Sequence, residues 1–229
     1  MLYNRKAWKH VFKLDPNKSL TDQQLDQICQ SGTDAIIVGG TDHVTLDGVL
    51  DLMSQIRRYT VPCVLEVSTL DAITPGFDFY NIPMVLNSRE KKWMMDIQHQ
   101  AVKEYGHFLN WDELVTEGYV ILNPEAKAYQ LTNCRLPDSD DVIAYAQMAE
   151  HIFKLPIFYI EYSGTYGDPE LVKKVKQELQ HTQLVYGGGI KHRSQAVEMA
   201  QYADVIVVGN GLYEQFDEAI ETVTAVKHG

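Results

Sequence analysis

The stretches Leu184-Val-Tyr-Gly-Gly-Gly-Ile190 and Val205-Ile-Val-Val-Gly-Asn-Gly211 decide the fold of this chain. Each is a short run of apolar and β-branched residues that stops at glycines, which is typical of a buried strand followed by a tight turn. A helical pattern, Arg193–Ala200, lies between them. A strand, a helix and a second strand in this order indicate a parallel βαβ unit.

The same alternation runs through the rest of the sequence. Strands are expected near His10–Leu14, Ala35–Val38, Val61–Glu66, Ile82–Leu86, Tyr119–Leu122, Ile157–Ile160, Leu184–Tyr186 and Val205–Val208. Apolar residues at three- and four-residue spacing predict helices near Thr21–Gln30, Val44–Arg57, Lys92–Tyr105, Asp138–Phe153, Pro169–Leu179, Arg193–Ala200 and Tyr213–Val226. Eight such units in one chain favour an α/β fold closed into a (β/α)8 TIM barrel, as a single domain over residues 1–229.

The third unit departs from this pattern. Ser68–Tyr80 is short and is broken by Thr74, Pro75 and Gly76, so it predicts an irregular segment where the third helix would lie. Such a segment would leave a groove on the flank of the barrel.

Composition excludes several classes of protein. The formal charge of −11 argues against nucleic acid as a main partner, because such binding depends on Lys and Arg. Cys29, Cys63 and Cys134 are odd in number and widely spaced, which indicates reduced thiols and no zinc ribbon. No apolar run reaches the roughly 20 residues of a membrane span, and residues 1–10 lack the apolar core of a signal peptide. We therefore expect a cytoplasmic protein.

The two glycine-rich stretches predict a phosphate site. Gly187, Gly188 and Gly189 follow one predicted strand, and Gly209 and Gly211 follow the next. Barrels often bind phosphate at the loops after their last two strands, where backbone N–H groups can approach the ligand. The alternative is that these glycines only form tight turns at the barrel corners.

Charged residues at the ends of other predicted strands complete a candidate site. Glu161 ends the sixth strand, and Lys13 and Asp15 share one face at the end of the first. Asp15 is a plausible Mg²⁺ ligand, since Mg²⁺ takes one or two carboxylates and completes its shell with water and phosphate. Thr41, after Gly39 and Gly40, could support that metal. The alternatives are a structural pair between Glu161 and a barrel lysine, a turn at Asp15, and helix capping by Thr41 or Asp42.

Five motifs occur in order along the chain: Phe12-Lys-Leu-Asp-Pro16, Asp34-Ala-Ile-Ile-Val-Gly-Gly-Thr41, Tyr159-Ile-Glu-Tyr-Ser-Gly164, Tyr186-Gly-Gly-Gly-Ile190 and Val207-Val-Gly-Asn210. Together they resemble the geranylgeranylglyceryl phosphate synthase family, in its bacterial heptaprenylglyceryl phosphate synthase branch. The resemblance implies an Mg²⁺-dependent prenyltransferase that joins a long prenyl group to the hydroxyl of sn-glycerol 1-phosphate, releasing pyrophosphate in ether lipid synthesis. It also implies a homodimer and a non-helical third segment.

By motif position, the resemblance assigns roles to individual residues. Asp15 and Thr41 would hold the metal, and Glu161 would orient or deprotonate the attacking hydroxyl. Glycerol phosphate would contact Lys13, Tyr159, Ile160, Glu161, Tyr162, Ser163, Gly164, Gly189, Gly209 and Asn210. The aromatic faces of Tyr159 or Tyr162 could also lessen the cost of a positive charge on the prenyl group.

The prenyl tail needs an apolar channel, which we expect at the open flank beside the helix Lys92–Tyr105. Small Ala101 on that helix would leave room for a long chain, although ordinary helix filling explains it better from the sequence alone. Arg89, Lys91, Lys92 and Trp93 form a basic and aromatic spot that could touch anionic lipid heads transiently at the channel entrance. A solvated helix start is the alternative.

Two other functions use the same phosphate loops. One is a phosphosugar isomerase or lyase barrel of amino-acid biosynthesis, which needs neither magnesium nor an apolar groove. The other is a non-catalytic phosphate-binding barrel, in which Lys13, Asp15 and Glu161 would be structural.

Overall fold

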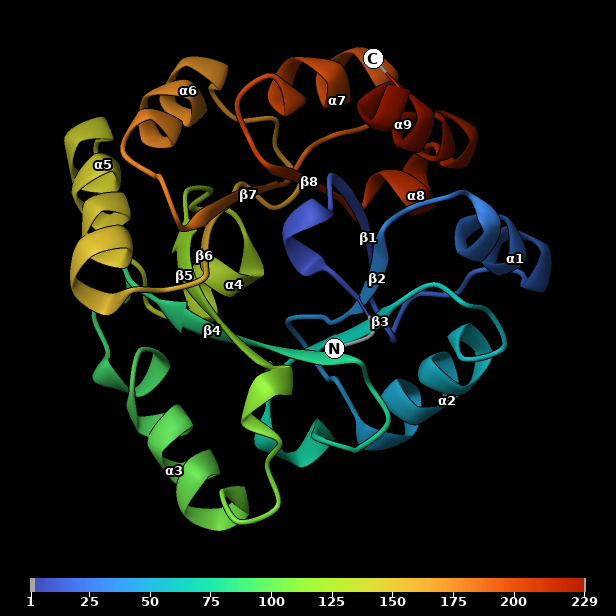
Figure 1. The fold of residues 1–229 in the computed structure, drawn as a ribbon, viewed down its shortest axis with the longest axis horizontal. Coiled ribbons are helices and arrows are strands. Elements are labelled where there is room, and N and C mark those ends of the chain that lie inside the picture. Colours follow the sequence, from blue (N-terminus) through green and yellow to red (C-terminus); the bar gives the residue numbers. More distant parts are fainter. Residues whose placement is uncertain (1–2, 229) are drawn as a thin grey trace.

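Each strand pairs in parallel with the next one along the chain, and the last strand returns to pair with the first, which closes the barrel (Figure 1). The computed structural model describes residues 3–228. The strands are β1 (His10–Leu14), β2 (Ala35–Val38), β3 (Cys63–Glu66), β4 (Phe79–Val85), β5 (Leu114–Ile121), β6 (Ile157–Glu161), β7 (Gln183–Gly187) and β8 (Val205–Val208). The predicted TIM barrel is confirmed.

Helices surround the barrel and connect its strands (Figure 1). The α-helices are α1 (Asp22–Gln30), α2 (Leu46–Ile56), α3 (Asp96–Tyr105), α4 (Lys127–Leu131), α5 (Ser139–Gln147), α6 (Pro169–Gln177), α7 (Arg193–Ala200), α8 (Gly211–Glu214) and α9 (Phe216–His228). The shorter helical turns are η1 (Arg5–Ala7), η2 (Leu70–Ala72), η3 (Lys91–Trp93) and η4 (Trp111–Glu113), and a π-helical segment, η5 (Met148–Phe153), continues α5. No helix among residues 3–228 has the length and apolar character to cross a bilayer.

Alternation along the strands produces two apolar layers. Side chains such as Val11, Ile37 and Tyr159 pack together inside the barrel. Their sequence neighbours, such as Phe12 and Ile160, pack outward against the helices. Because a strand residue and the residue two positions later point the same way, Lys13 and Glu161 share the inner side with Val11 and Tyr159.

Two strands begin several residues before their predicted starts. β4 begins at Phe79 instead of Ile82, and β5 begins at Leu114 instead of Tyr119. The additional residues include Asn81, Glu117 and Gly118, which interrupt the apolar pattern that sequence reading depends on. They extend the strands because barrel pairing and burial outweigh their weak strand propensity.

The irregular third connection is confirmed. Between β3 and β4 the chain forms only η2 and otherwise lacks regular helix. The helix that follows β4, α3, stands away from the strands at the lower left of Figure 1. This side of the barrel therefore lacks the close helix cover found elsewhere.

Candidate active site

The carboxyl ends of β1, β2, β6, β7 and β8 surround one cavity, as the sequence predicts. The cavity is lined by backbone or side-chain atoms of Lys13, Asp15, Gly39, Gly40, Thr41, Tyr159, Glu161, Ser163, Gly164, Gly188, Gly189, Ile190, Val207, Gly209, Asn210 and Tyr213. We call it the phosphate cavity. It brings together nearly all the residues that the sequence singled out from five separate strand ends.

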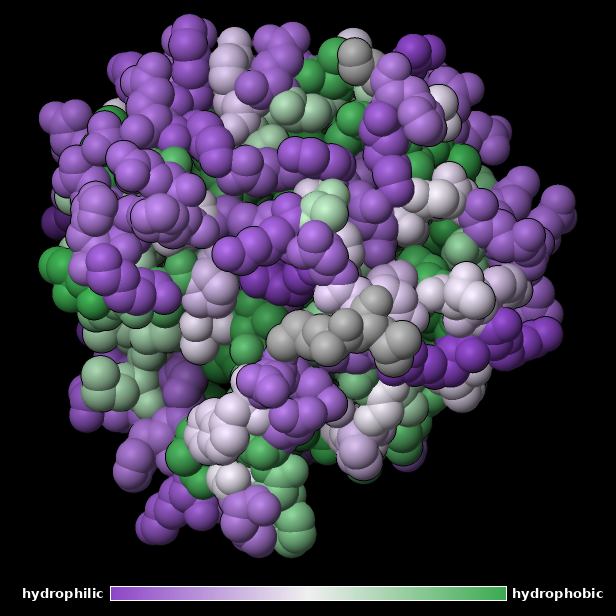
Figure 2. Space-filling view, in the orientation of Figure 1, coloured by the Kyte–Doolittle hydropathy of each residue, from purple (hydrophilic) through white to green (hydrophobic). Residues whose placement is uncertain are grey.

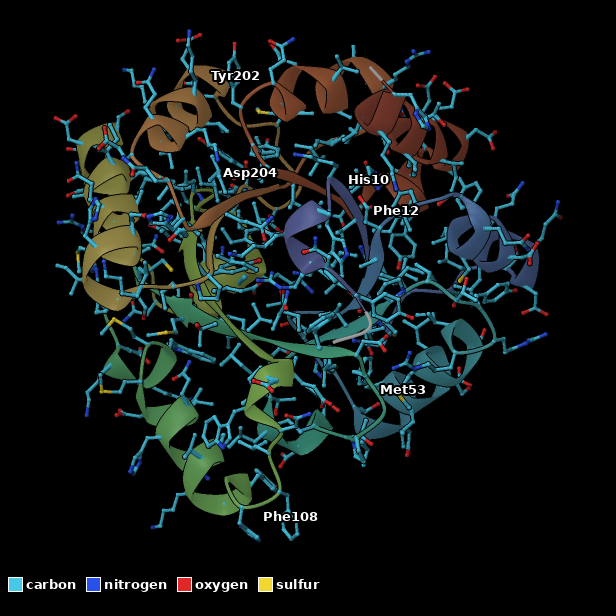
Figure 3. The ribbon with its side chains drawn as sticks, viewed as in Figure 1. His10, Phe12, Met53, Phe108, Tyr202 and Asp204 are labelled. Carbon is cyan, nitrogen blue, oxygen red and sulfur yellow. The ribbon has the colours of Figure 1, made fainter. Side chains whose placement is uncertain are left out.

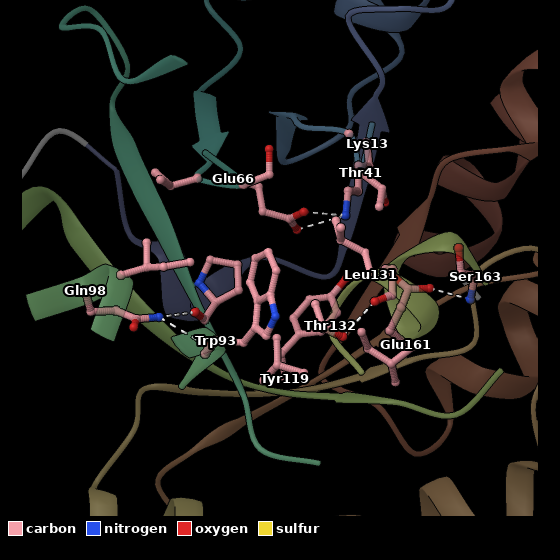
Figure 4. Close-up of a pocket in the computed structure, with 18 residues that line it drawn as sticks. Lys13, Thr41, Glu66, Trp93, Gln98, Tyr119, Leu131, Thr132, Glu161 and Ser163 are labelled. Atoms are coloured by element: carbon pink, nitrogen blue, oxygen red, sulfur yellow. Dashed lines mark hydrogen bonds and ion pairs between the residues drawn. The ribbon is translucent and has the colours of Figure 1, made fainter. Parts of the chain in front are cut away.

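A second cavity opens beside it towards the flank of the irregular third connection (Figure 4). We call it the flank cavity. Apolar side chains from β4, β5, η3, α4 and the start of α3 line it, including Val85, Ile121, Trp93 and Ile97. The two cavities share five residues: Lys13, Gly40, Thr41, Glu161 and Ser163.

Lys13 is held by a carboxylate that the sequence reading did not consider. Its ammonium donates to Glu66 at the end of β3, with Nζ–Oε1 and Nζ–Oε2 distances of 2.7 and 2.9 Å (Figure 4). Burial acts to lower the pKa of Lys13, but Glu66 and then Glu161 outweigh it and raise that pKa. Lys13 therefore stays charged at the junction of the two cavities.

Glu161 is fixed through both carboxylate oxygens. Tyr119 on β5 donates its hydroxyl to Oε2 at 2.8 Å, and the backbone N–H of Ser163 donates to Oε1 at 2.5 Å. The structural alternative, a direct pair between Glu161 and a barrel lysine, is wrong, because the lysine contact belongs to Glu66. Figure 4 shows Lys13 directed towards Glu66, whereas Glu161 lies beside Ser163.

Tyr159 and Tyr119 form a stacked pair in the barrel interior. Their ring centroids lie 4.5 Å apart at an interplanar angle of 26°. Burial, followed by the charge of Glu161, raises the pKa of each phenol well above its ordinary value, so both remain neutral. The Tyr159 hydroxyl is buried and has no hydrogen-bond partner among residues 3–228, and Tyr159 is one of the residues that line the phosphate cavity. A ligand in that cavity could supply the missing partner.

The glycine loops bring backbone donors to the cavity. Gly188 and Gly189 have φ angles of 120° and 67°, which favour glycine. A Cβ on Gly189 would also lie 2.1 Å from the backbone of Thr165, so only glycine permits this packing of the two loops. In the described part of the chain, the N–H groups of Gly189, Gly209 and Asn210 donate to no protein carbonyl. These N–H groups can donate hydrogen bonds to a bound anion.

Asp15 and Thr41 both line the phosphate cavity. Asp15 Oδ1 accepts the N–H of Asn17 at 2.9 Å, so the predicted turn is present, and it lies against Gly40, where a Cβ would be 2.8 Å away. Helix capping by Thr41 is wrong, because Thr45 caps α2. The described residues hold no cluster of three His, Cys, Asp or Glu side chains. One carboxylate beside a hydroxyl fits an Mg²⁺ ion whose shell is completed by diphosphate and water.

Two predicted contacts are not brought together with the others. Ile160 is fully buried against the helix layer, and Tyr162 packs on the same outer cluster beside Tyr186. Neither side chain lines a cavity, because their strand positions alternate with those of Tyr159 and Glu161. Tyr162 therefore cannot present its ring to a prenyl cation, whereas Tyr119 and Tyr159 are on the inner side.

Sequence reasoning missed Glu66 and Tyr119. Glu66 is the last residue of a predicted strand, as Glu161 nearly is, so the same strand-end argument was available for it. No sequence pattern pointed to Tyr119, since a tyrosine at the start of an apolar run is typical of a buried packing residue. Only the register that places Tyr119 opposite Tyr159 reveals its contact with Glu161.

Comparison with known proteins places this site in a family. The model of the PcrB family matches residues 3–227. A heptaprenylglyceryl phosphate synthase of Geobacillus sp. is 61% identical over 227 residues, covering 99% of this chain and 100% of that one. That of Oceanobacillus iheyensis is 64% identical over 225 residues, covering 98% of each.

Solved structures share the fold. The (S)-3-O-geranylgeranylglyceryl phosphate synthase of Thermoplasma acidophilum, in complex with its substrate sn-glycerol-1-phosphate, matches with a TM-score of 0.86 at 23% identity, covering 98% of this chain and 95% of that one. A thiamine phosphate pyrophosphorylase of Pyrococcus furiosus matches less well, with a TM-score of 0.62 at 14% identity over 98% of each chain.

Proposed function

This chain belongs to the PcrB family, and on that premise we propose that it transfers a heptaprenyl group from its diphosphate to the hydroxyl of sn-glycerol 1-phosphate. The observation that carries the proposal is the pair of cavities that meet at Lys13 and Glu161. One offers backbone donors to a phosphate. The other offers an apolar path to a lipid tail.

In the proposed binding mode, glycerol phosphate lies in the phosphate cavity. Its phosphate would accept the free N–H groups of Gly189, Gly209 and Asn210 and the hydroxyl of Tyr159. Lys13 would supply the nearby positive charge. This places the attacking hydroxyl towards Glu161, at the boundary with the flank cavity.

The reaction forms one C–O bond and breaks another. The glycerol hydroxyl oxygen bonds to the first carbon of the prenyl chain, while the bond from that carbon to the diphosphate breaks and pyrophosphate leaves with the electron pair. Glu161, held in place by Tyr119 and Ser163, accepts the hydroxyl proton. The neutral ring faces of Tyr119 and Tyr159 reduce the cost of positive charge on the allylic carbon.

Asp15 and Thr41 are the residues that would hold Mg²⁺. When bound, the ion would neutralise charge on the leaving diphosphate. Lys18 lies close to this rim, since its ammonium donates to Asn210 Oδ1 at 2.8 Å. It adds a second cation to the side where diphosphate would enter.

The prenyl tail follows the flank cavity along α3. Each buried CH2 contributes about 0.8 kcal/mol, so a long chain gains substantial binding energy there. Exposed Val102, Tyr105, Phe108 and Trp111 extend the apolar surface beyond the cavity. Apolar surface is visible over this end of α3 in Figure 2, and Figure 3 shows Phe108 directed away from the barrel. Together with Lys91 and Lys92, this surface would contact a membrane transiently while the lipid enters.

A product assay tests the function. The protein is incubated with radiolabelled sn-glycerol 1-phosphate, Mg²⁺ and prenyl diphosphates of several lengths. We expect organic-extractable label, greatest with the heptaprenyl substrate and abolished by EDTA. Absence of extractable label at every chain length would favour an isomerase, a lyase or a non-catalytic protein. Sedimentation of the same protein would test the expected homodimer.

A further inference from the structure

A polar pair lies inside the barrel and lines neither cavity. Glu117 on β5 and Asn81 on β4 are 1% and 4% exposed. Asn81 Nδ2 donates to Glu117 Oε1 at 2.7 Å. The other oxygens, Asn81 Oδ1 and Glu117 Oε2, are buried and have no hydrogen-bond partner among residues 3–228. An ionised carboxylate would leave two buried acceptors without a donor, which is costly.

The charges around Glu117 come from four elements. Lys13 of β1 and Arg5 of η1 are positive, and Glu66 of β3 and Glu161 of β6 are negative. These four groups balance without Glu117. An ionised Glu117 would add an unbalanced negative charge next to the cavity that must bind two anionic substrates.

We propose that Glu117 is a positioning residue, which carries a proton on Oε2 in the active enzyme and so keeps the positive charge of Lys13 available to the phosphate of the acceptor. The proton turns Oε2 from a buried acceptor without a donor into a donor, while Oε1 continues to accept from Asn81. Glu117 acts through Lys13 and does not touch substrate. This role rests on the proposed function.

The surrounding groups make the proton stable at neutral pH. Burial, followed by the charge of Glu66, raises the pKa of Glu117 to about 8, against the opposing effect of Lys13 and Arg5. Lys13, Tyr119 and Tyr159 do not change charge there, since the pKa of each is raised. Loss of the Glu117 proton is thus the event expected as the pH passes about 8.

The test is the pH dependence of the KM for glycerol 1-phosphate in wild type and in Glu117→Gln. Glutamine is neutral and similar in shape, and its amide supplies the missing donor. We expect the wild-type KM to rise several-fold above about pH 8 with little change in kcat, and the variant to keep the low KM throughout. The control is Glu104→Gln, which removes an exposed negative charge on α3. Its KM should rise above about pH 8 as the wild-type KM does.

A purely structural role predicts a different result. Glu117→Gln would then change stability while its KM followed the wild-type profile, and this outcome would overturn the proposal. So would a wild-type KM that stays flat through pH 8.

A second measurement is independent of turnover. Infrared spectroscopy of the wild-type protein at neutral pH should show the carbonyl band of a buried carboxylic acid that disappears at alkaline pH. Its absence contradicts the proposal even if Glu117→Gln does not fold. Calorimetry of glycerol 1-phosphate binding over the same pH range tests the role of Glu117 separately from the proposed reaction. If no lipid product forms, the proposed reaction fails, while the infrared band still reports whether Glu117 carries a proton.

Discussion

Glu161 and Tyr159 lie two residues apart on one strand, but their side chains differ in the hydrogen bonds that they form. The carboxylate of Glu161 accepts two hydrogen bonds, from Tyr119 and Ser163, and is therefore oriented before any ligand arrives. The hydroxyl of Tyr159 is buried and has no hydrogen-bond partner in the described part of the chain. One group is prepared to take a proton, and the other is prepared to bind.

Replacing Glu161 by glutamine removes the proton acceptor and keeps its size. We expect kcat to fall about 100-fold to 10,000-fold, the usual contribution of a positioned base. Steady-state product formation measures it. The control is Tyr119→Phe, which keeps the base but removes one of its two orienting bonds, and should lose less. Full activity of Glu161→Gln would eliminate Glu161 as the base.

Replacing Tyr159 by phenylalanine separates binding from stability. Removing a buried hydroxyl that has no protein partner should leave the free energy of unfolding unchanged or improve it. The KM for glycerol 1-phosphate should rise by about 10-fold, as expected for a lost hydrogen bond to a charged group of roughly 1.5 kcal/mol. Tyr162→Phe is the matched control, because its ring faces the helix layer. An unchanged KM in Tyr159→Phe would show that the hydroxyl does not meet the phosphate.

At the level of secondary structure, the same kind of contact recurs at the amino ends of three strand pairs: an aspartate carboxylate accepts backbone N–H groups of the neighbouring strand. Asp34, Asp78 and Asp204 each precede an even-numbered strand and accept backbone N–H groups at the start of the preceding strand. Each also pairs with a basic side chain, from Lys227, Arg57 and Lys176 respectively. The resemblance between Asp34-Ala-Ile-Ile-Val and Asp204-Val-Ile-Val-Val therefore reflects an equivalent structural role at the end opposite the site.

Asp204→Ala should destabilise the barrel without affecting its chemistry. The substitution removes the acceptor for Leu184 N–H at 2.8 Å and the partner of Lys176. We expect a loss of about 1–3 kcal/mol in the free energy of unfolding by urea, since these bonds involve a charged group. Asp96→Ala removes an exposed pair with Lys91 and should cost at most about 1 kcal/mol. Equal losses would mean that this contact has no special value.

The length of the accepted prenyl chain should depend on α3. Ala101 lies one helical turn after Ile97, which lines the flank cavity, but Ala101 itself lines neither cavity. Ala101→Trp should project a ring into the continuing path and shift the preference from heptaprenyl diphosphate to shorter substrates. Competition between prenyl diphosphates measures the shift. Lys103→Trp, at an exposed position of α3 outside that apolar surface, should not change it. An unaltered preference in Ala101→Trp would place the tail elsewhere.

At the scale of the whole molecule, His10 joins the two ends of the chain. Its Nε2 lies 2.9 Å from Thr222 Oγ1 on α9, and its Nδ1 lies 3.0 Å from Thr33 Oγ1 (Figure 3). Burial lowers the pKa of His10 to about 3, so the folded protein keeps this ring neutral. The unfolded chain protonates it below about pH 6.5.

This difference predicts acid sensitivity. Because the unfolded state binds the extra proton, stability should fall as the pH decreases below about 6.5, approaching about 1.4 kcal/mol per pH unit from this group. His10→Gln should weaken that dependence between about pH 6.5 and 5. Urea denaturation at several pH values tests it, and parallel stability curves for the two proteins would contradict it. Thr224→Ala, on the same helix but away from His10, serves as the control.

The barrel, the irregular third connection and most residues of the phosphate cavity could be predicted from the sequence alone. These properties are local: apolar strand runs, helical spacing, breakers such as Pro75, and polar residues at strand ends can all be read along the chain. The carboxyl ends of parallel strands must then meet at one face. That is why Lys13, Asp15, Glu161 and the glycines could be grouped before their positions were known.

Only the tertiary structure decided which of those groups contact one another. Strand register placed Lys13 on Glu66, Tyr119 on Glu161 and Asn81 on Glu117, and alternation directed Ile160 and Tyr162 away from the cavity. Such contacts join residues 36 to 53 positions apart. They depend on how each strand is aligned with its neighbours and on the burial that forces polar groups to find partners, and neither is encoded in a local pattern.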